Sequence, residues 1–346
     1  MNTIKERAAA IAAAAQKLNS AVYNASNDHG KITEARTVAQ QHSPKLVSLE
    51  EAIKQSGLKD GMTISFHHHF RGGDKVVNLV VGKLAEMGFK NLHLAASSLL
   101  DTHEPLIEHI KNGVITQIST SGLRGELARQ ISLGLMENPV VFRSHGGRGA
   151  AIAKGELHID VAYSDLTSSD PLGNACGYSR SENAQSICGS LGYALPDAEY
   201  ADKVVILTDD LVNYPNTPAS ISERYVDYVV QVDSVGDSSK IASGAIRDTK
   251  NPRDILLAKQ AAKVIEHSGY LTPGFSIQTG SGGASLAVVK YLRNAMVEQN
   301  IKASFALGGI TAHMVKLHEE GLIERLIDVQ SFDKVAAELV KNDAMH

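Results

Sequence analysis

The sequence predicts an α/β protein with two lobes, each built on a mainly parallel sheet. Short apolar strands alternate with helices along most of the 346 residues, a pattern typical of parallel sheets covered on both faces. A strand–glycine turn–helix–strand unit at 62–97 recurs at 275–307, and both copies contain a Gly-Gly pair. A duplicated α/β unit is expected to place its site between the two copies.

The first lobe is predicted to span residues 46–215, after an N-terminal helical arm at residues 1–45. Ser48 and Glu51 form a capping-box signature that opens the first helix, which Gly57 ends. The other predicted elements are strands at 62–66, 91–97, 114–119, 139–142, 158–163 and 203–208, and helices at 74–87, 104–113 and 122–135. The loop 164–187 is long and polar, and loops of this length inside a domain are usually functional.

The second lobe is predicted to span residues 216–346, after the proline-marked connection at 213–218. Its helix at 252–267 has Pro252 in the first turn and Gly269 just past its end. The other predicted elements are strands at 225–232, 275–279 and 302–307 and a helix at 284–297.

Composition favours a globular protein in a reducing, cytoplasmic location. Apolar residues make up 43% of the sequence, charged residues 21%, and the formal net charge is −4. The negative charge argues against nucleic acid and anionic membranes as partners. No stretch approaches the roughly 18 apolar residues of a membrane span. Cys176 and Cys188 form no CxxC pair and predict no metal framework.

The stretch 64–74 is predicted to bind an anion. An apolar strand ends here, and three histidines, an arginine and two glycines follow before a helix. A glycine turn at a helix N-terminus offers backbone N–H groups, and ligands of α/β sheets bind at the carboxyl ends of strands. Neither the dinucleotide nor the P-loop fingerprint is present. His67, His69 and Arg71 are expected to bind a carboxylate and to supply positive charge.

A second cationic glycine turn, residues 143–148, follows the strand at 139–142. Two arginines beyond Arg71 suit a tricarboxylate, because a guanidinium can hold a carboxylate through two hydrogen bonds. An ordinary surface loop is the alternative for this turn. The residues expected to bind substrate here are Arg143, His145 and Arg148.

Five strings in the sequence are long enough to identify a family. They are ISFHHHFRGGD at 64–74, FRSHGGRGAAIAKGELHIDVAYSD at 142–165, DPLGNACG at 170–177, CGSLGYALPDAEYADKVVILTDDLV at 188–212 and FSIQTGSGGASLAV at 275–288. They resemble the citrate lyase alpha subunit, the citrate CoA-transferase component of that complex, and the resemblance runs from about Leu46 to Phe332. It implies two CoA-transferase-like lobes, the second of them partial, because the family is substantially longer.

The resemblance implies that citrate and an acetyl thioester react to give a citryl thioester and acetate. A citrate carboxylate attacks the acetyl carbonyl, and the released thiolate then attacks the citryl carbonyl of the mixed anhydride. The thiol belongs to a CoA-like prosthetic group on the acyl carrier (gamma) subunit, or to acetyl-CoA, and no covalently bound cofactor is expected. The expected partners are the lyase (beta) subunit and the carrier, within an oligomer.

Both steps pass through oxyanions, which the N–H groups of glycine turns can stabilise. The glycines expected to act in catalysis are Gly72, Gly73, Gly282 and Gly283. The residues expected to bind the thioester or CoA are Gly146, Gly147, Asn174, Gly280, Ser281, Gly308 and Gly309. For Asn174 the alternative is an ordinary turn, which Pro, Gly and Asn favour.

Several alternatives remain open at this point. Zinc at His67 and His69 needs a third ligand that the sequence does not identify, so no metal is expected. Glu182 imitates the nucleophile of transferases that form a glutamyl thioester, but it lies in the first lobe. No carboxylate follows the strand 302–307, where such enzymes place theirs, so direct attack by citrate is expected. The competing functions are a free-CoA transferase of another carboxylate and a scaffold subunit that binds acids without turnover.

Overall fold

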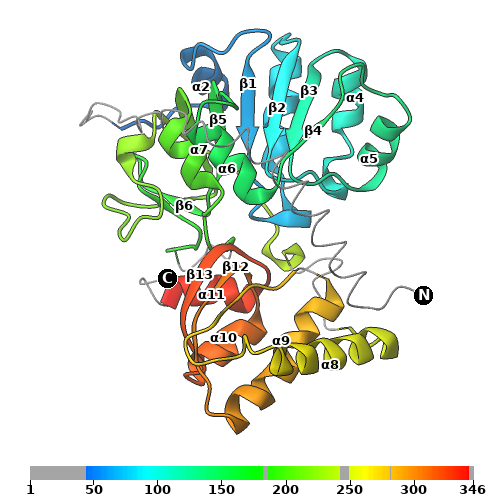
Figure 1. The fold of residues 1–346 in the computed structure, drawn as a ribbon. Helices are drawn as coiled ribbons and strands as arrows, with labels where there is room; N and C mark the ends of the chain where they lie inside the picture. The colour runs from blue at the N-terminus through cyan, green and yellow to red at the C-terminus, as the bar shows by residue number, and fades with distance from the viewer. Residues whose placement is uncertain (1–43, 182–185, 242–248, 281, 343–346) are drawn as a thin grey trace.

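The computed structural model describes residues 44–181, 186–241, 249–280 and 282–342, so nearly all of the predicted N-terminal arm lies outside the described residues. The described chain forms two lobes, one around a seven-stranded sheet and one around a three-stranded sheet (Figure 1). Both sheets are parallel, and the two-lobed α/β fold that the sequence predicts is confirmed.

The larger sheet has the strand order β10-β8-β5-β1-β2-β3-β4, with all its neighbours parallel. Its strands are β1 (Thr63–Phe66), β2 (Leu92–Ala96), β3 (Ile115–Thr120), β4 (Val141–Phe142), β5 (Val161–Asp165), β8 (Lys203–Thr208) and β10 (Tyr228–Gln231). The strands other than β4 are mostly buried, as expected for a parallel sheet covered on both faces. The parallel arrangement brings all their carboxyl ends to one edge of the sheet.

Within the described residues, six α-helices belong to this lobe. They are α2 (Leu49–Gln55), α3 (Val76–Glu86), α4 (Leu106–Lys111), α5 (Gly125–Ser132), α6 (His145–Ala153) and α7 (Ala194–Tyr200). Two of them, α2 and α6, begin at a serine whose side chain caps the helix. The predicted capping box of α2 is present, with reciprocal hydrogen bonds between Ser48 and Glu51. A 3₁₀ turn at Arg71–Gly73 precedes α3, which therefore begins two residues later than predicted.

Two sequence predictions about the larger lobe are corrected. The strand expected to open the second lobe is β10, and it pairs with β8, so the larger sheet continues past residue 215. The loop 164–187 contains β6 (Ser168–Ser169) and β7 (Ala175–Cys176), which form a small sheet with β9 (Asp210–Leu211). Buried polar groups in the described part of this segment have partners within it and on neighbouring segments, as the hydroxyls of Ser168 and Ser179 show, which permits their burial.

The smaller lobe has a core of its own beneath the larger one in the view of Figure 1. Its sheet has the order β11-β12-β13, and the strands are β11 (Ser276–Ile277), β12 (Ala303–Ile310) and β13 (Ile323–Ser331). Its helices are α8 (Pro252–His267), α9 (Gly283–Glu298), α10 (Ala312–Glu319) and α11 (Lys334–Asn342). The predicted repeat of the first lobe corresponds to β11, α9 and β12.

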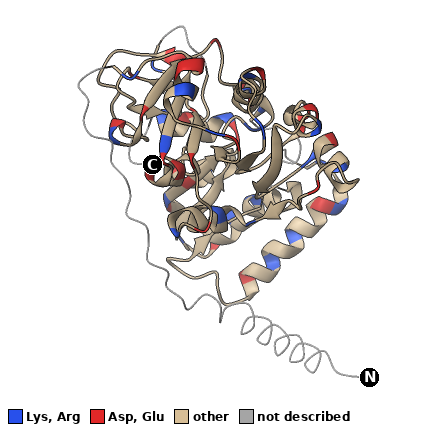
Figure 2. Ribbon diagram, turned by 90° about the horizontal axis from the view of Figure 1, so that it is seen from above, with Lys and Arg blue, Asp and Glu red and all other residues tan. Residues whose placement is uncertain are grey.

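Charged residues of both signs are interspersed over the two lobes (Figure 2). Within the described part of the chain, no helix is both long and apolar enough to cross a membrane.

Candidate functional site

The three consecutive histidines lie where the chain leaves the carboxyl end of β1. All three are buried, and His69 has no exposed surface. Burial disfavours the charged imidazolium, so it lowers their pKa values, that of His67 to about 4. The histidines are therefore neutral at physiological pH. This corrects the expectation that they supply positive charge.

Arg71 is the cation of this turn, and only 8% of its surface is exposed. Its Nη1 donates to Oε1 of Gln330 over 3.3 Å, and its guanidinium lies 4.9 Å from the centroid of the Phe332 ring. Its Nε has no partner among the described residues. Burial, and then the nearby charge of Arg124, lowers the pKa of Arg71 to about 10, so it remains charged.

The backbone of Arg71 is in the left-handed region, with φ of +53°. Such a conformation is unfavourable for a residue with a Cβ atom and is found most often at functional sites. The side chain of Arg71 reaches the junction of the two lobes, where it contacts Gln330. This buried cation has no carboxylate partner among the described residues. Both features are typical of a site built for an anionic ligand.

The structure brings the two cationic turns together through a group of aromatic rings. Tyr193, the residue before α7, stacks on His68 with ring centroids 5.9 Å apart. His145 of the second turn approaches Tyr193 edge-on at 5.1 Å and His68 at 5.9 Å. Arg143, two residues before His145, is half-buried, and its Nη1 has no partner among the described residues. The second turn is therefore part of the same region as the first.

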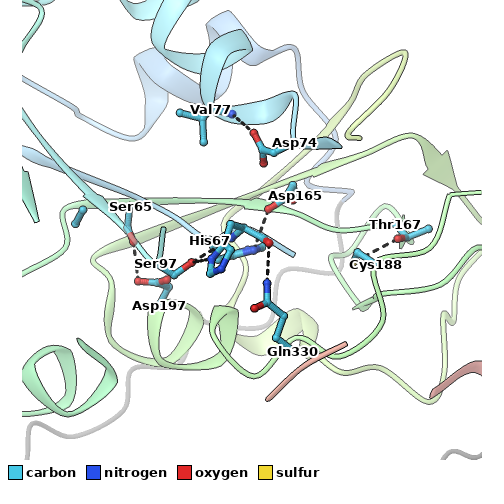
Figure 3. Close-up of polar contacts among 12 residues, drawn as sticks. Ser65, His67, Asp74, Val77, Ser97, Asp165, Thr167, Cys188, Asp197 and Gln330 are labelled. Carbon is cyan, nitrogen blue, oxygen red and sulfur yellow. Dashed lines mark hydrogen bonds and ion pairs between the residues drawn. The ribbon is translucent and has the colours of Figure 1, made fainter. Parts of the chain in front are cut away.

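His67 belongs to a buried group of two carboxyls and two imidazoles. Nδ1 of His67 lies 2.9 Å from Oδ1 of Asp165, at ion-pair distance but without good hydrogen-bond alignment (Figure 3). Nε2 of His103 lies 3.2 Å from Oδ1 of Asp74. Burial, and then the nearby charge of Asp74, raises the pKa of Asp165 well above its usual range. The contact with Asp165 orients the His67 ring.

Arg148 has a structural partner, which differs from the expectation that it binds substrate. Its Nη2 lies 3.0 Å from Oδ2 of Asp197, and the pair is buried. The same nitrogen donates to Oγ of Ser65, which in turn donates to Oδ1 of Asp197 (Figure 3). Because Asp197 neutralises the guanidinium, Arg148 contributes little free charge to an anion.

Two glycines of the cationic turns already use their N–H groups inside the fold. The N–H of Gly73 donates to the carbonyl of Phe70, and that of Gly147 to Oγ of Ser144, the N-cap of α6. A Cβ atom at Gly73 would clash with the backbone of Asp237, so close packing explains this glycine. Gly72 lies in the 3₁₀ turn, and Gly146 lies in the first turn of α6 with open space around it.

Asn174 also has a structural role, in place of the expected contact with CoA. Its Nδ2 donates to Asp170 and to Glu223, and its Oδ1 accepts from the backbone N–H of Glu223. Oδ1 of Asp170 accepts the N–H groups of residues 172–174. These contacts form the turn that the alternative interpretation predicted.

The glycines of the smaller lobe lie at the carboxyl ends of its strands. Gly282 is the N-cap of α9 and Gly283 its first residue, and the N-cap glycine has no side chain to cap the helix. A Cβ atom at Gly308 would clash with Gln278, and one at Gly309 with the Phe332 ring. Gly280 lies in the turn after β11, while Ser281 and Glu182 lie outside the described residues.

An open cleft of about 1110 Å³ adjoins the first glycine turn. Gly72, Gly73 and Asp74 line one side, and Asp209, Lys240 and Lys334 are among the residues of the other sides. Burial raises the pKa of Asp209. The cleft lies beside the ends of β8 and β10, at the carboxyl edge where α/β sheets bind ligands.

A cluster with the composition of a metal site lies away from the histidine turn. The ligand atoms of His158, Asp160 and Asp202 lie within 4.8 Å of one another near the amino ends of β5 and β8. Among the described residues, these three form the group whose ligand atoms lie close enough to hold a metal ion, and it does not include His67 or His69.

Sequence reasoning missed three residues of the site: Tyr193, Gln330 and Phe332. Gln330 and Phe332 lie at the carboxyl end of β13, a strand that was not predicted. The rule that ligands gather at strand ends would have identified them if 323–331 had been assigned as a strand. Tyr193 lies in a string with no local signal of chemistry.

Comparison with known proteins identifies the family to which this chain belongs. The family model "Citrate lyase, alpha subunit (CitF)" matches residues 43–346. The citrate lyase alpha chain of Klebsiella pneumoniae is 62% identical over 299 residues, which cover 86% of this chain and 58% of that protein. The chain therefore spans less than two thirds of the length of the curated relative it matches.

Solved structures agree with this comparison. The alpha subunit of citrate lyase from Streptococcus mutans, in complex with citrate, has a TM-score of 0.85 and 54% identity, covering 91% of this chain and 62% of that one. A 4-hydroxybutyrate CoA-transferase from Porphyromonas gingivalis has a TM-score of 0.52 at 14% identity, covering 87% and 66%. At that identity the similarity shows the fold alone, which is that of CoA-transferases.

Proposed function

Because the chain belongs to the citrate lyase alpha-subunit family, we propose that it acts as the citrate CoA-transferase component of citrate lyase. The reaction exchanges the acetyl group of an acetyl thioester for a citryl group and releases acetate. The related alpha subunit from Streptococcus mutans was solved with citrate, which supports citrate as the acid.

One observation carries this proposal: Arg71 is a buried, strained cation between the lobes, with no carboxylate partner among the described residues. An unpaired buried charge is costly, so a protein retains one where a ligand compensates it. A guanidinium binds a carboxylate through two parallel hydrogen bonds. Arg143, in the same turn as His145, has an Nη1 without a partner among the described residues and offers a second such group.

The chemistry needs no net transfer of protons. A citrate carboxylate oxygen attacks the acetyl carbonyl carbon, the carbon–sulfur bond breaks, and a thiolate leaves. The thiolate then attacks the citryl carbonyl of the mixed anhydride, and the bond to the acetate oxygen breaks. Arg71 stabilises the attacking citrate, and holding both acyl groups in one place supplies the proximity that the reaction requires.

Backbone donors for the two oxyanions come from helix starts. The N-cap of α9 is a glycine, which offers no side-chain cap, so the N–H groups that follow Gly282 are the best candidates in the smaller lobe. In the larger lobe, Gly146 at the start of α6 is preferred to Gly147 and Gly73, whose N–H groups have protein partners.

A second candidate is a transferase that forms a covalent enzyme thioester, and Asp328 is the observation that favours it. Transferases of that type place their nucleophilic carboxylate just after the strand predicted here at 302–307. Asp328 on β13 pairs with Gly308, beside that position. Its Oδ1 is buried without a partner among the described residues, and burial raises its pKa to about 7. Citrate as the direct nucleophile remains our proposal, since Arg71 provides for a bound acid.

The thioester would come from the CoA-like prosthetic group of an acyl carrier subunit or from acetyl-CoA, and no covalently bound cofactor is proposed. The lyase and carrier subunits of a cytoplasmic citrate lyase oligomer are the proposed partners. Citrate binding tests the site directly by titration calorimetry on the wild type and Arg71→Ala. Loss of about 100-fold in affinity is expected for one charged bidentate contact. Equal affinities would remove Arg71 from the site.

A further inference from the structure

Gln330 connects the two lobes at the candidate site. It lies at the end of β13 in the smaller lobe and is 1% exposed. Its Nε2 donates to the carbonyl oxygen of His68 over 2.7 Å, and its Oε1 accepts from Nη1 of Arg71 over 3.3 Å. Figure 3 shows the side chain reaching from β13 to the histidine turn. One amide therefore bridges both ends of the turn that carries Arg71.

The strand end around Gln330 is held against the larger lobe by further contacts. The N–H of Ser190 donates to Oγ of Ser331, and the hydroxyl of Ser190 donates to the carbonyl of Asp328. Gly192 packs so closely on Val329 that a Cβ atom there would clash. Phe332 covers the guanidinium of Arg71. Arg71 thus takes its side-chain contacts from the smaller lobe, although its backbone belongs to the larger one.

We propose that Gln330 is a positioning residue for Arg71, holding its guanidinium in the orientation that binds an anion. The inference rests on the proposed function, and it assigns the second lobe a part in binding citrate. When β13 contacts the histidine turn, the amide fixes the guanidinium and leaves Nε and Nη2 for a carboxylate.

The chemistry of an amide suits this role better than that of an acid. A neutral amide oxygen orients the guanidinium without neutralising it, and the amide N–H₂ satisfies the buried carbonyl of His68. A carboxylate at the same position would form an ion pair with Arg71 and compete with the substrate. Comparing an amide with a carboxylate at position 330 therefore tests whether the residue positions Arg71 or only fills space beside it.

Two variants of similar size test the proposal by calorimetry with citrate. Gln330→Met removes both hydrogen bonds and adds no charge, and it is expected to weaken citrate binding about tenfold. Gln330→Glu also loses the bond to His68 but adds a carboxylate beside Arg71, and it is expected to weaken binding at least about 100-fold. Glu324→Gln, an exposed change on the same strand, serves as the matched control and should bind like the wild type. Equal losses in the Met and Glu variants would overturn the proposal.

A second measurement does not depend on citrate. Phenylglyoxal labels accessible guanidinium groups, and peptide mass spectrometry reports the rate at each arginine. Gln330→Met should speed labelling of Arg71 about tenfold, Gln330→Glu should slow it, and Arg143 should be unchanged in both. Unchanged labelling of Arg71 in both variants would refute positioning. If the wild type binds no citrate but the labelling follows this pattern, the proposed function fails while the role of Gln330 stands.

Discussion

Arg148 and Asp197 form a buried ion pair, with Nη2 of the arginine 3.0 Å from Oδ2 of the aspartate. Both side chains are at least 96% enclosed, and the hydroxyl of Ser65 completes the group. The pair joins α6 to α7 beneath the residues that face the lobe junction. It therefore belongs to the support of the site and not to its ligand-binding surface.

The first prediction follows from this pair. Arg148→Met leaves Asp197 buried without its cation, so the free energy of unfolding should fall by about 3–5 kcal/mol, as measured by urea denaturation. Arg148→Met combined with Asp197→Leu should recover part of that loss, since no charge is then stranded. A single variant that keeps wild-type stability but binds citrate poorly would return Arg148 to the ligand-binding surface.

The second prediction concerns the strained backbone of Arg71. Glycine adopts positive φ without penalty, so Arg71→Gly should be more stable than Arg71→Ala by about 1 kcal/mol, although glycine usually destabilises. Both variants should lose citrate affinity equally, because neither has a guanidinium. Thermal unfolding and calorimetry on the two proteins provide the comparison. A glycine variant less stable than the alanine variant would show that the conformation is not strained.

The third prediction uses two glycines with opposite surroundings. A Cβ atom at Gly309 would enter the Phe332 ring, so Gly309→Ala should displace Phe332 and cost about 1–3 kcal/mol of stability. Gly146 has open space around it in the first turn of α6, so Gly146→Ala is the matched control, with a change near zero or stabilising. The reverse order in urea denaturation would contradict the packing described here.

The fourth prediction concerns pH and His67. Its pKa is about 4 in the folded chain and near 6.5 when unfolded, so its contribution to stability is complete above pH 6.5 and lost as pH falls toward 4. His67→Gln should therefore reduce the pH dependence of the unfolding free energy between pH 6.5 and 5, by up to about 1.4 kcal/mol per pH unit.

His68 and His69 contribute with the same sign as His67, because burial also lowers their pKa values. Asp165 and Asp328, whose pKa values are raised, contribute with the opposite sign. The difference between variant and wild type reports His67 together with its effect on the adjacent Asp165. An equal slope in the His67 variant would mean that this ring titrates normally.

The sequence was most informative where one local signal determines one element. Pro252 and Gly269 bracket α8, whose bounds match the prediction, and Ser48 with Glu51 marks the start of α2. The sequence was least informative where the position of an element depends on the strand with which it pairs. Nothing within residues 225–232 indicates which sheet the strand joins, because a parallel strand buries both faces in either lobe.

The site shows the same limit. Strand ends and cationic residues located Arg71, Arg143 and His145 in one region, which local pattern alone can suggest. Local pattern could not distinguish the free charge of Arg71 from the paired charge of Arg148, because the partner of Arg148 is Asp197, 49 residues further along the chain. Nor could it show that Gln330, 259 residues from Arg71, completes the turn.

Oxygen transfer from citrate to acetate tests the central claim most directly. The chain, in excess over acetyl-CoA or the acetylated carrier, is mixed with citrate labelled with ¹⁸O in its carboxylates, and the released acetate is weighed by mass spectrometry. Direct attack by citrate predicts that the acetate of the first turnover contains one ¹⁸O atom. Unlabelled acetate, together with a CoA adduct on the chain that Asp328→Asn abolishes, would contradict it and establish an enzyme thioester. Release of no acetate would contradict the transferase function itself.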